Sequence, residues 1–161
     1  METHGPGPEH FMREAIRVSF ENVRKERGGP FGSIVVRGNE IVGRGWNQVT
    51  TANDPTAHAE VMAIRDACAR LGTFRLDSCT LYASCEPCPM CLSAIYWARI
   101  EHVYFAATRT DAARAGFDDD WIYRELARPA EQRQIPGTPC LRDEALGAFE
   151  EWGASTRKQP Y

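Results

Sequence analysis

Residues 80–106 read TLYASCEPCPMCLSAIYWARIEHVYFA, and this stretch decides the fold. A β-type run at Thr80–Ala83 leads to Pro87, which opens a helix to about Ala98, and a second β-type run covers His102–Ala106. Two strands that are joined through a helix run parallel, with a right-handed crossover. The sequence therefore predicts an α/β protein with parallel strands in its later part.

The residues before this stretch predict two helices and a hairpin. A two-residue turn, Gly38-Asn39, separates two β-type runs and so supplies an antiparallel pair. The other predicted elements are a helix at 9–27, strands at 31–37 and 40–46, a polar turn-like stretch at 47–55, and a helix from the start signal Asp54-Pro55-Thr56 to about Leu71.

The residues after this stretch continue the alternation of helices and strands. Helices are predicted at 111–115, 121–127 and 143–152, with a short last strand at Gln134-Ile135. The order of the elements predicts an α/β sandwich around a mixed sheet. A length of 161 residues predicts a single domain, residues 1–161.

Composition and charge exclude several classes of protein. The net charge of -3 argues against a dedicated nucleic-acid binder, so no nucleic-acid partner is expected. No apolar run approaches the roughly 20 residues that span a bilayer, so no membrane partner is expected either. Residues 1–10 lack a signal-peptide pattern, so the cytoplasm is the expected location. In a reducing compartment, six cysteines indicate metal binding rather than disulfides.

Two short motifs carry the chemistry. His58 and Glu60 open one predicted helix, and Cys88 and Cys91 lie three residues apart in the first turn of another, where their side chains share a face. The helix dipole favours their thiolates, the form that binds a metal. His58, Cys88 and Cys91 would then be three ligands of one zinc ion per subunit. They leave its fourth position open for water, as in catalytic sites. The pattern H-x-E followed by P-C-x-x-C is the signature of zinc nucleobase deaminases, in which Glu60 would move protons without binding the metal.

Other interpretations of the cysteines stay open. A C-x-x-C pair also occurs in four-ligand structural zinc sites and in redox dithiols. A structural site needs a fourth ligand, for which Cys85 is the only close candidate, and a redox dithiol leaves His58 and Glu60 unexplained. The scattered cysteines are predicted to be small core residues: Cys68, Cys79 and Cys140.

At these motifs the chain resembles the cytidine deaminase-like superfamily and, within it, the bacterial guanine deaminases. The matching blocks 28–32, 53–60 and 84–91 are shared in part with transfer-RNA adenosine deaminases. Gly116-Phe117-Asp118-Asp119 and the terminal Tyr161 are similar to guanine deaminases in particular. The matching blocks cover nearly the whole chain: 28–32, 53–60, 84–91, 95–99, 110–113 and 115–119.

The resemblance implies a three-layer sandwich, with a mixed five-stranded sheet and helices on both faces. It also implies a homodimer in which the C-terminal segment, about residues 140–161, swaps to the partner subunit. In the substrate site, Asn47 would hydrogen-bond a purine base, and Phe31 and Trp97 would lie near its ring. Asp119 and Tyr161 of the partner subunit would complete the recognition. Without the resemblance, Asn47 would be a turn residue and the acidic run 118–120 a solvated helix start.

Together these expectations describe the zinc-dependent hydrolysis of guanine to xanthine and ammonia. A zinc-bound water would give its proton to Glu60 and attack C2, and Glu60 would then protonate ring N3 and the leaving amine. Guanine presents N1–H and an amino group, so its site needs an acceptor such as Asp119. The alternatives are a deaminase of guanosine, cytidine or transfer-RNA adenosine, and a non-catalytic zinc-binding interaction module. The net charge argues against transfer RNA, and the intact Glu60 argues against the module.

Overall fold

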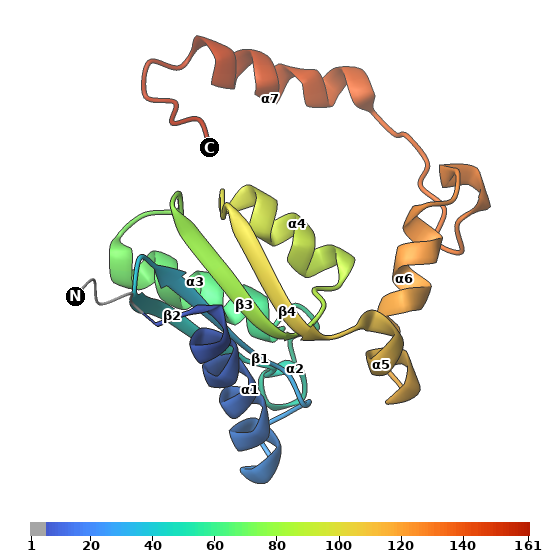
Figure 1. The fold of residues 1–161 in the computed structure, drawn as a ribbon. Coiled ribbons are helices and arrows are strands. Elements are labelled where there is room, and N and C mark those ends of the chain that lie inside the picture. Colours follow the sequence, from blue (N-terminus) through green and yellow to red (C-terminus); the bar gives the residue numbers. More distant parts are fainter. Residues whose placement is uncertain (1–5) are drawn as a thin grey trace. The chain divides into compact units, whose positions relative to one another are not determined.

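The computed structural model describes residues 6–161; residues 1–5, part of the stretch that lacks a signal-peptide pattern, lie outside it. The chain divides into two compact units, one ending at Tyr123 and the other running from Arg124 to Tyr161. The first unit contains the sheet and the helices that cover it (Figure 1).

The sheet has four strands in the order β2-β1-β3-β4. β1 is antiparallel to both of its neighbours, and β3 and β4 are parallel, as their connection through a helix predicts. The strands are β1 (Gly32–Arg37), β2 (Glu40–Trp46), β3 (Cys79–Cys85) and β4 (His102–Ala107). The mixed sheet is therefore confirmed, but it has four strands among the described residues rather than the expected five.

Helices cover both faces of the sheet, which confirms the three-layer sandwich (Figure 1). α1 (Pro8–Arg24) packs on one face, and α3 (Ala59–Leu71) and α4 (Pro89–Trp97) pack on the other. Ile34 of β1 belongs to the core beneath α1, whereas the next residue, Val35, belongs to the core beneath α3 and α4. This switch follows from the alternation of side chains along a strand.

Two glycines of β2 let the backbone of α3 pack directly against the backbone of the strand. A Cβ atom added at Gly45 would lie 2.1 Å from the carbonyl oxygen of Ala59, and one added at Gly43 would lie 2.4 Å from that of Ala63. Only a residue without a side chain fits at either position. The first turn of α3, which begins at Ala59, is therefore held directly against the strand.

The connection from β2 to α3 differs from its prediction. The turn-like stretch contains a short helix, α2 (Val49–Ala52), and α3 begins at Ala59 rather than near Pro55. The Asp54 carboxylate accepts hydrogen bonds from the backbone N–H and the hydroxyl of Thr56 at 2.8 and 2.7 Å. A short Asp side chain that binds its own backbone two residues on forms a turn instead of a helix start.

After β4 the chain forms helices only. They are α5 (Arg109–Arg114), α6 (Asp119–Leu126), the 3₁₀ turn η1 (Ala130–Gln132) and α7 (Arg142–Ala154). The strand predicted at Gln134-Ile135 is wrong: the backbone N–H of Gln134 donates to the Glu125 carboxylate at 2.7 Å, and Pro136 follows at once. Cys79 is buried as predicted, but Cys140 is exposed, so it is not a core residue.

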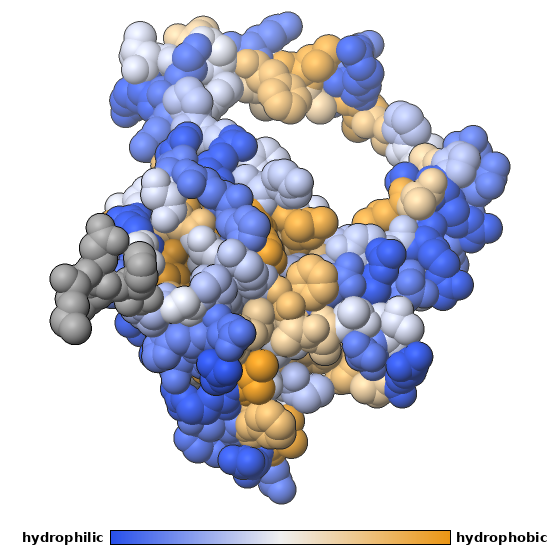
Figure 2. Space-filling model, viewed as in Figure 1, coloured by the Kyte–Doolittle hydropathy of each residue, from blue (hydrophilic) through white to orange (hydrophobic). Residues whose placement is uncertain are grey.

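Several large hydrophobic side chains reach the surface of the first unit. On the face in Figure 2, hydrophobic residues gather over the end of α1, where Phe20 and Val23 are exposed. Tyr96 and Trp97 of α4 and Phe105 of β4 are exposed as well. Among the described residues, no helix is long and apolar enough to cross a membrane.

Candidate metal and substrate site

The strand directions bring most of the predicted site residues to one edge of the sheet. β2, β3 and β4 run in the same direction and β1 runs in the opposite one. The segments that follow β2, β3 and β4 and the segment that precedes β1 therefore meet at the same edge of the sheet. Open α/β sheets bind their ligands at this edge. These segments carry Asn47, His58 and Glu60 after β2, Cys88 and Cys91 after β3, Asp119 after β4, and Phe31 before β1.

Three of these side chains have the spacing of zinc ligands. Nδ1 of His58 lies 3.6 Å from Sγ of Cys88 and 3.5 Å from Sγ of Cys91, and all three ligand atoms lie within 4.8 Å of one another. Zn–N and Zn–S bonds of about 2.1 and 2.3 Å at a tetrahedral angle place nitrogen and sulfur about 3.6 Å apart. The donor atoms and their distances therefore fit zinc.

The local structure leaves these side chains available to a metal. His58 and Cys88 are the N-cap residues of α3 and α4, yet neither side chain makes a capping hydrogen bond. The hydrogen bond from Cys91, together with that from His58, lowers the pKa of Cys88 to about 4 despite its burial. The hydrogen bond to Cys88, together with burial, raises the pKa of Cys91. The lowered pKa of Cys88 favours its thiolate, the form that binds a metal.

Cys85 does not join this group. Its thiol lies 3.6 Å from the carbonyl oxygen of Thr108, to which it donates, and burial raises its pKa to about 11. The group of ligand atoms that lie within 4.8 Å of one another contains His58, Cys88 and Cys91 but not Cys85, which a structural zinc site would need as its fourth ligand. The arrangement of the three remaining ligands is that of a catalytic site, with one position open.

A cavity of about 220 Å³ lies beside the three ligands. Glu60 lines it, only 7% exposed, and burial raises the pKa of its carboxyl group to about 7. A carboxyl group with such a pKa can both accept and donate a proton near neutral pH. The other lining residues are Gly29, Phe31, Asn47, Val49, Thr50, His58, Glu86, Cys88, Phe117 and Asp119.

Asn47 lines the cavity with a fixed orientation. Its Oδ1 accepts hydrogen bonds from the backbone N–H groups of Gly29 and Val49, at 3.4 and 3.2 Å. Its own backbone is held by the fully buried Asn22, whose amide donates to the carbonyl oxygen of Asn47 at 3.0 Å. Because Oδ1 is engaged with the backbone, the Nδ2 amide of Asn47 is the group that faces a ligand as a hydrogen-bond donor.

The lining of the cavity also contains acidic and aromatic side chains. Burial raises the pKa of Asp119, at the start of α6, above its usual range. Phe31 and Phe117 meet edge to face, with ring centroids 4.7 Å apart. Phe117 and Glu86 also line the cavity and are not predicted from the sequence, although they lie inside the matching blocks 115–119 and 84–91. Phe117 had a usable signal, since it stands two residues before Asp119 after a glycine.

Of the remaining two predicted residues, Trp97 is not among the residues that line this cavity. Trp97 is 61% exposed at the last position of α4, nine residues after Cys88 and thus about 14 Å along the helix axis. Tyr161 ends the second compact unit, so its part in the site stays a prediction.

Comparisons with known proteins agree with this chemistry. Residues 7–107 match the family model of the cytidine and deoxycytidylate deaminase zinc-binding region. The chain is 52% identical to the guanine deaminase of Bacillus subtilis over 95% of its own length and 98% of that protein. It is 44% identical to the transfer-RNA-specific adenosine deaminase of Aquifex aeolicus, over 63% of its own length and 66% of that protein.

The fold agrees with that of a solved relative. The X-ray structure of the guanine deaminase from Bacillus subtilis superimposes with a TM-score of 0.93 at 51% identity. The match covers 97% of this chain and 99% of that one. The similarity to this relative thus extends over both compact units, whereas the similarity to the adenosine deaminase covers a part of the chain.

Proposed function

The chain belongs to the zinc-binding cytidine and deoxycytidylate deaminase family, and we propose that within this family it hydrolyses guanine to xanthine and ammonia. The proposal rests on the residues that line one cavity. Ligands for zinc and the buried carboxyl group of Glu60 lie beside a fixed donor, Asn47, and an acceptor, Asp119. The near full-length similarity to a guanine deaminase supports the same substrate.

The reaction divides between the metal and the chain's own residues. His58, Cys88 and Cys91 would hold the zinc ion, which would supply a Lewis acid to activate the attacking water. Glu60 accepts a proton from this water, and the water oxygen bonds to C2 of guanine. Glu60 gives this proton to ring N3, then takes a second proton from the hydroxyl now on C2 and passes it to the amine. The C2–N bond breaks, a carbonyl forms at C2 and ammonia leaves. The raised pKa of Glu60 suits a group that works as base and then as acid.

The polar groups of the cavity match the edge of guanine. The Nδ2 amide of Asn47 donates to an acceptor of the purine, such as its carbonyl oxygen or a ring nitrogen. The Asp119 carboxylate accepts from a donor such as N1–H, which a base lacking that donor would leave unpaired at a cost. Phe31 packs against the ring. The cavity is smaller than the roughly 300–1,000 Å³ of sites for drug-sized ligands, which favours a free base over a nucleoside.

The test is a comparison of substrates. Zinc-loaded protein is incubated with guanine, guanosine, adenine, cytosine, cytidine and a transfer-RNA stem-loop containing adenosine, and ammonia is measured. Guanine is expected to release ammonia fastest by a wide margin, and the Glu60→Gln variant serves as the control for contaminating activity. Faster release from any other substrate would refute guanine as the substrate. Full zinc content with no release from any of them would favour a non-catalytic zinc-binding module.

The assembly extends the proposal beyond one chain. The active enzyme is a homodimer of single-domain subunits in which residues 140–161 reach the partner, so that Tyr161 of the partner subunit completes the base site. The exposed Tyr96, Trp97 and Phe105 support a partner surface, because aromatic side chains are enriched in protein interfaces. We assign Trp97 no contact in the cavity of its own subunit. The cytoplasmic location predicted from the sequence stays a prediction.

A further inference from the structure

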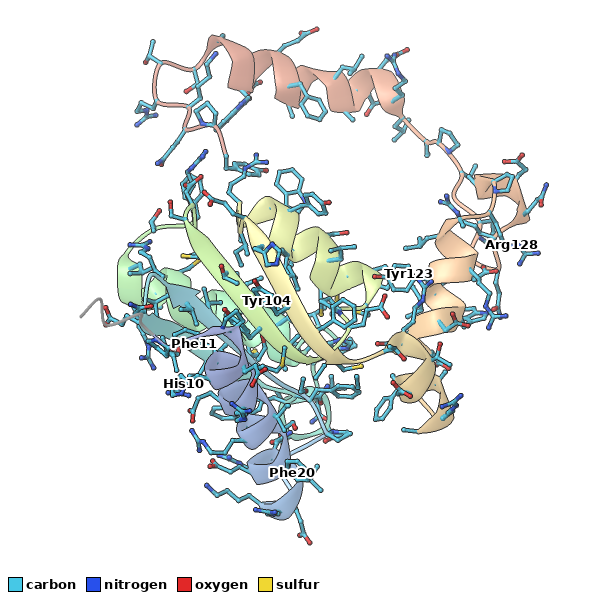
Figure 3. The ribbon with its side chains drawn as sticks, in the orientation of Figure 1. His10, Phe11, Phe20, Tyr104, Tyr123 and Arg128 are labelled. Carbon is cyan, nitrogen blue, oxygen red and sulfur yellow. The ribbon has the colours of Figure 1, made fainter. Side chains whose placement is uncertain are left out.

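A hydrogen bond joins α6 to the loop that precedes the metal ligands. The hydroxyl of Tyr123 donates to the carbonyl oxygen of Pro87 at 2.7 Å, and Pro87 directly precedes Cys88. Figure 3 shows Tyr123 reaching from α6 toward the start of α4. The side chain is half-buried and is not among the residues that line the cavity.

The placement of Tyr123 on α6 connects this bond to Asp119. The two residues are four positions apart and therefore share one face of the helix, so the turn that presents the carboxylate is the turn that the hydroxyl secures. A second contact secures the same turn: the Arg109 guanidinium lies 4.6 Å from the centroid of the Tyr123 ring and 3.8 Å from the Asp120 carboxylate. Tyr123 is also the last residue of the first compact unit.

We propose that Tyr123 is a positioning residue for base recognition. Its hydroxyl holds the first turn of α6 on the carbonyl of Pro87 and thereby keeps the Asp119 carboxylate in the cavity. The proposal rests on the proposed function, in which Asp119 accepts a hydrogen bond from guanine. Because Tyr123 acts on recognition and not on proton transfer, its removal weakens binding of the base and leaves the catalytic step intact.

The test is Tyr123→Phe, which removes the hydroxyl and keeps the ring beneath Arg109. Tyr104→Phe is the matched control, because Tyr104 stacks on Tyr82 in the sheet and does not line the cavity. Both variants are compared with the wild type for zinc content, melting temperature, and KM and kcat for guanine. Loss of one hydrogen bond predicts that KM rises about threefold to tenfold in Tyr123→Phe. Zinc content stays at one ion per chain, kcat stays within about twofold, and Tyr104→Phe matches the wild type.

Two results would overturn the inference. An unchanged KM shows that the hydroxyl does not act on recognition. A fall in zinc content or kcat that accompanies any rise in KM shows that Tyr123 supports the metal ligands instead of Asp119. A wild-type protein that releases no ammonia from guanine refutes the proposed function and the inference with it, whereas active wild type with an indistinguishable Tyr123→Phe refutes the inference alone.

Discussion

Replacement of Gly45 by alanine tests whether the contact between β2 and α3 sets the catalytic geometry. The new Cβ would lie 2.1 Å from the carbonyl oxygen of Ala59 and 2.3 Å from the backbone nitrogen of Ala63. Both are backbone atoms, so no side-chain rotation relieves the overlap. A carbon and a carbonyl oxygen approach to about 3.3 Å, so the first turn of α3 has to move by about 1 Å.

This movement displaces residues of the catalytic site. Ala59 stands between His58 and Glu60, so the displaced turn carries a zinc ligand and the proton-transfer group together. Overpacking of this kind costs about 1–3 kcal/mol of folding free energy. A misplacement of about 1 Å in a catalytic group costs about 10²-fold in rate. We therefore expect Gly45→Ala to fold with reduced stability and to lose about 10²-fold in kcat for guanine.

Urea unfolding gives the stability, and kcat is measured under conditions in which the variant is folded by circular dichroism. Gly137→Ala is the matched control, because nothing lies within 4 Å of a Cβ at that position. It should resemble the wild type in both measurements. A folded Gly45→Ala protein with the kcat of the wild type would refute the argument, since the helix would then tolerate the added methyl group without moving the site.

Four further outcomes follow from the site. Glu60→Gln should keep its zinc, measured by elemental analysis, and lose at least about 10²- to 10⁴-fold in kcat, because the amide cannot shuttle protons; substantial turnover would exclude Glu60 as the shuttle. Cys88→Ala should lose the zinc that the wild type retains, and full zinc content would contradict the assigned ligand set. Phe117→Ala should raise KM for guanine about threefold to tenfold by removing an aromatic wall, and an unchanged KM would show that the ring does not contact the base. Deletion of residues 157–161 should lower guanine turnover, and unchanged turnover would show that Tyr161 lies outside the active site.

The fold was predictable where the sequence pattern is local. The Gly38-Asn39 turn, the strand–helix–strand unit around Pro87 and the first helix each depend on residues close in sequence. Each formed as predicted, although the first helix, α1, ends at Arg24 rather than at residue 27. The failures depended on competing local interactions. Asp54 closed a turn with its own side chain instead of starting α3. Gln134 gave its backbone N–H to Glu125, which no pattern of hydrophobicity reveals.

The prediction that zinc is the cofactor is confirmed, and it follows from the spacing of the ligands and from coordination chemistry. Cys88 and Cys91 lie within one helical turn, so their proximity follows from the helix alone. Asn47 shows the opposite situation. Its conformation depends on a local hydrogen bond from Val49 and on contacts with Gly29 and the buried Asn22, which lie 18 and 25 residues away in the sequence. Without the family resemblance, Asn47 would have remained a turn residue.

The same contrast explains why the choice of base is harder to derive than the reaction. Water activation needs groups at the starts of two helices that follow β2 and β3. These strands run in the same direction on either side of β1, and strand direction alone brings the groups together. Base recognition adds Asp119, which comes after the edge strand β4 and helix α5, in a segment that forms no strand of the sheet. Its place in the cavity depends on the contact of Tyr123 with Pro87, and a hydroxyl that binds a distant carbonyl leaves no pattern in the sequence. Substrate selectivity can therefore change in this segment, by substitutions near Tyr123, while the metal ligands and Glu60 keep the same hydrolytic chemistry.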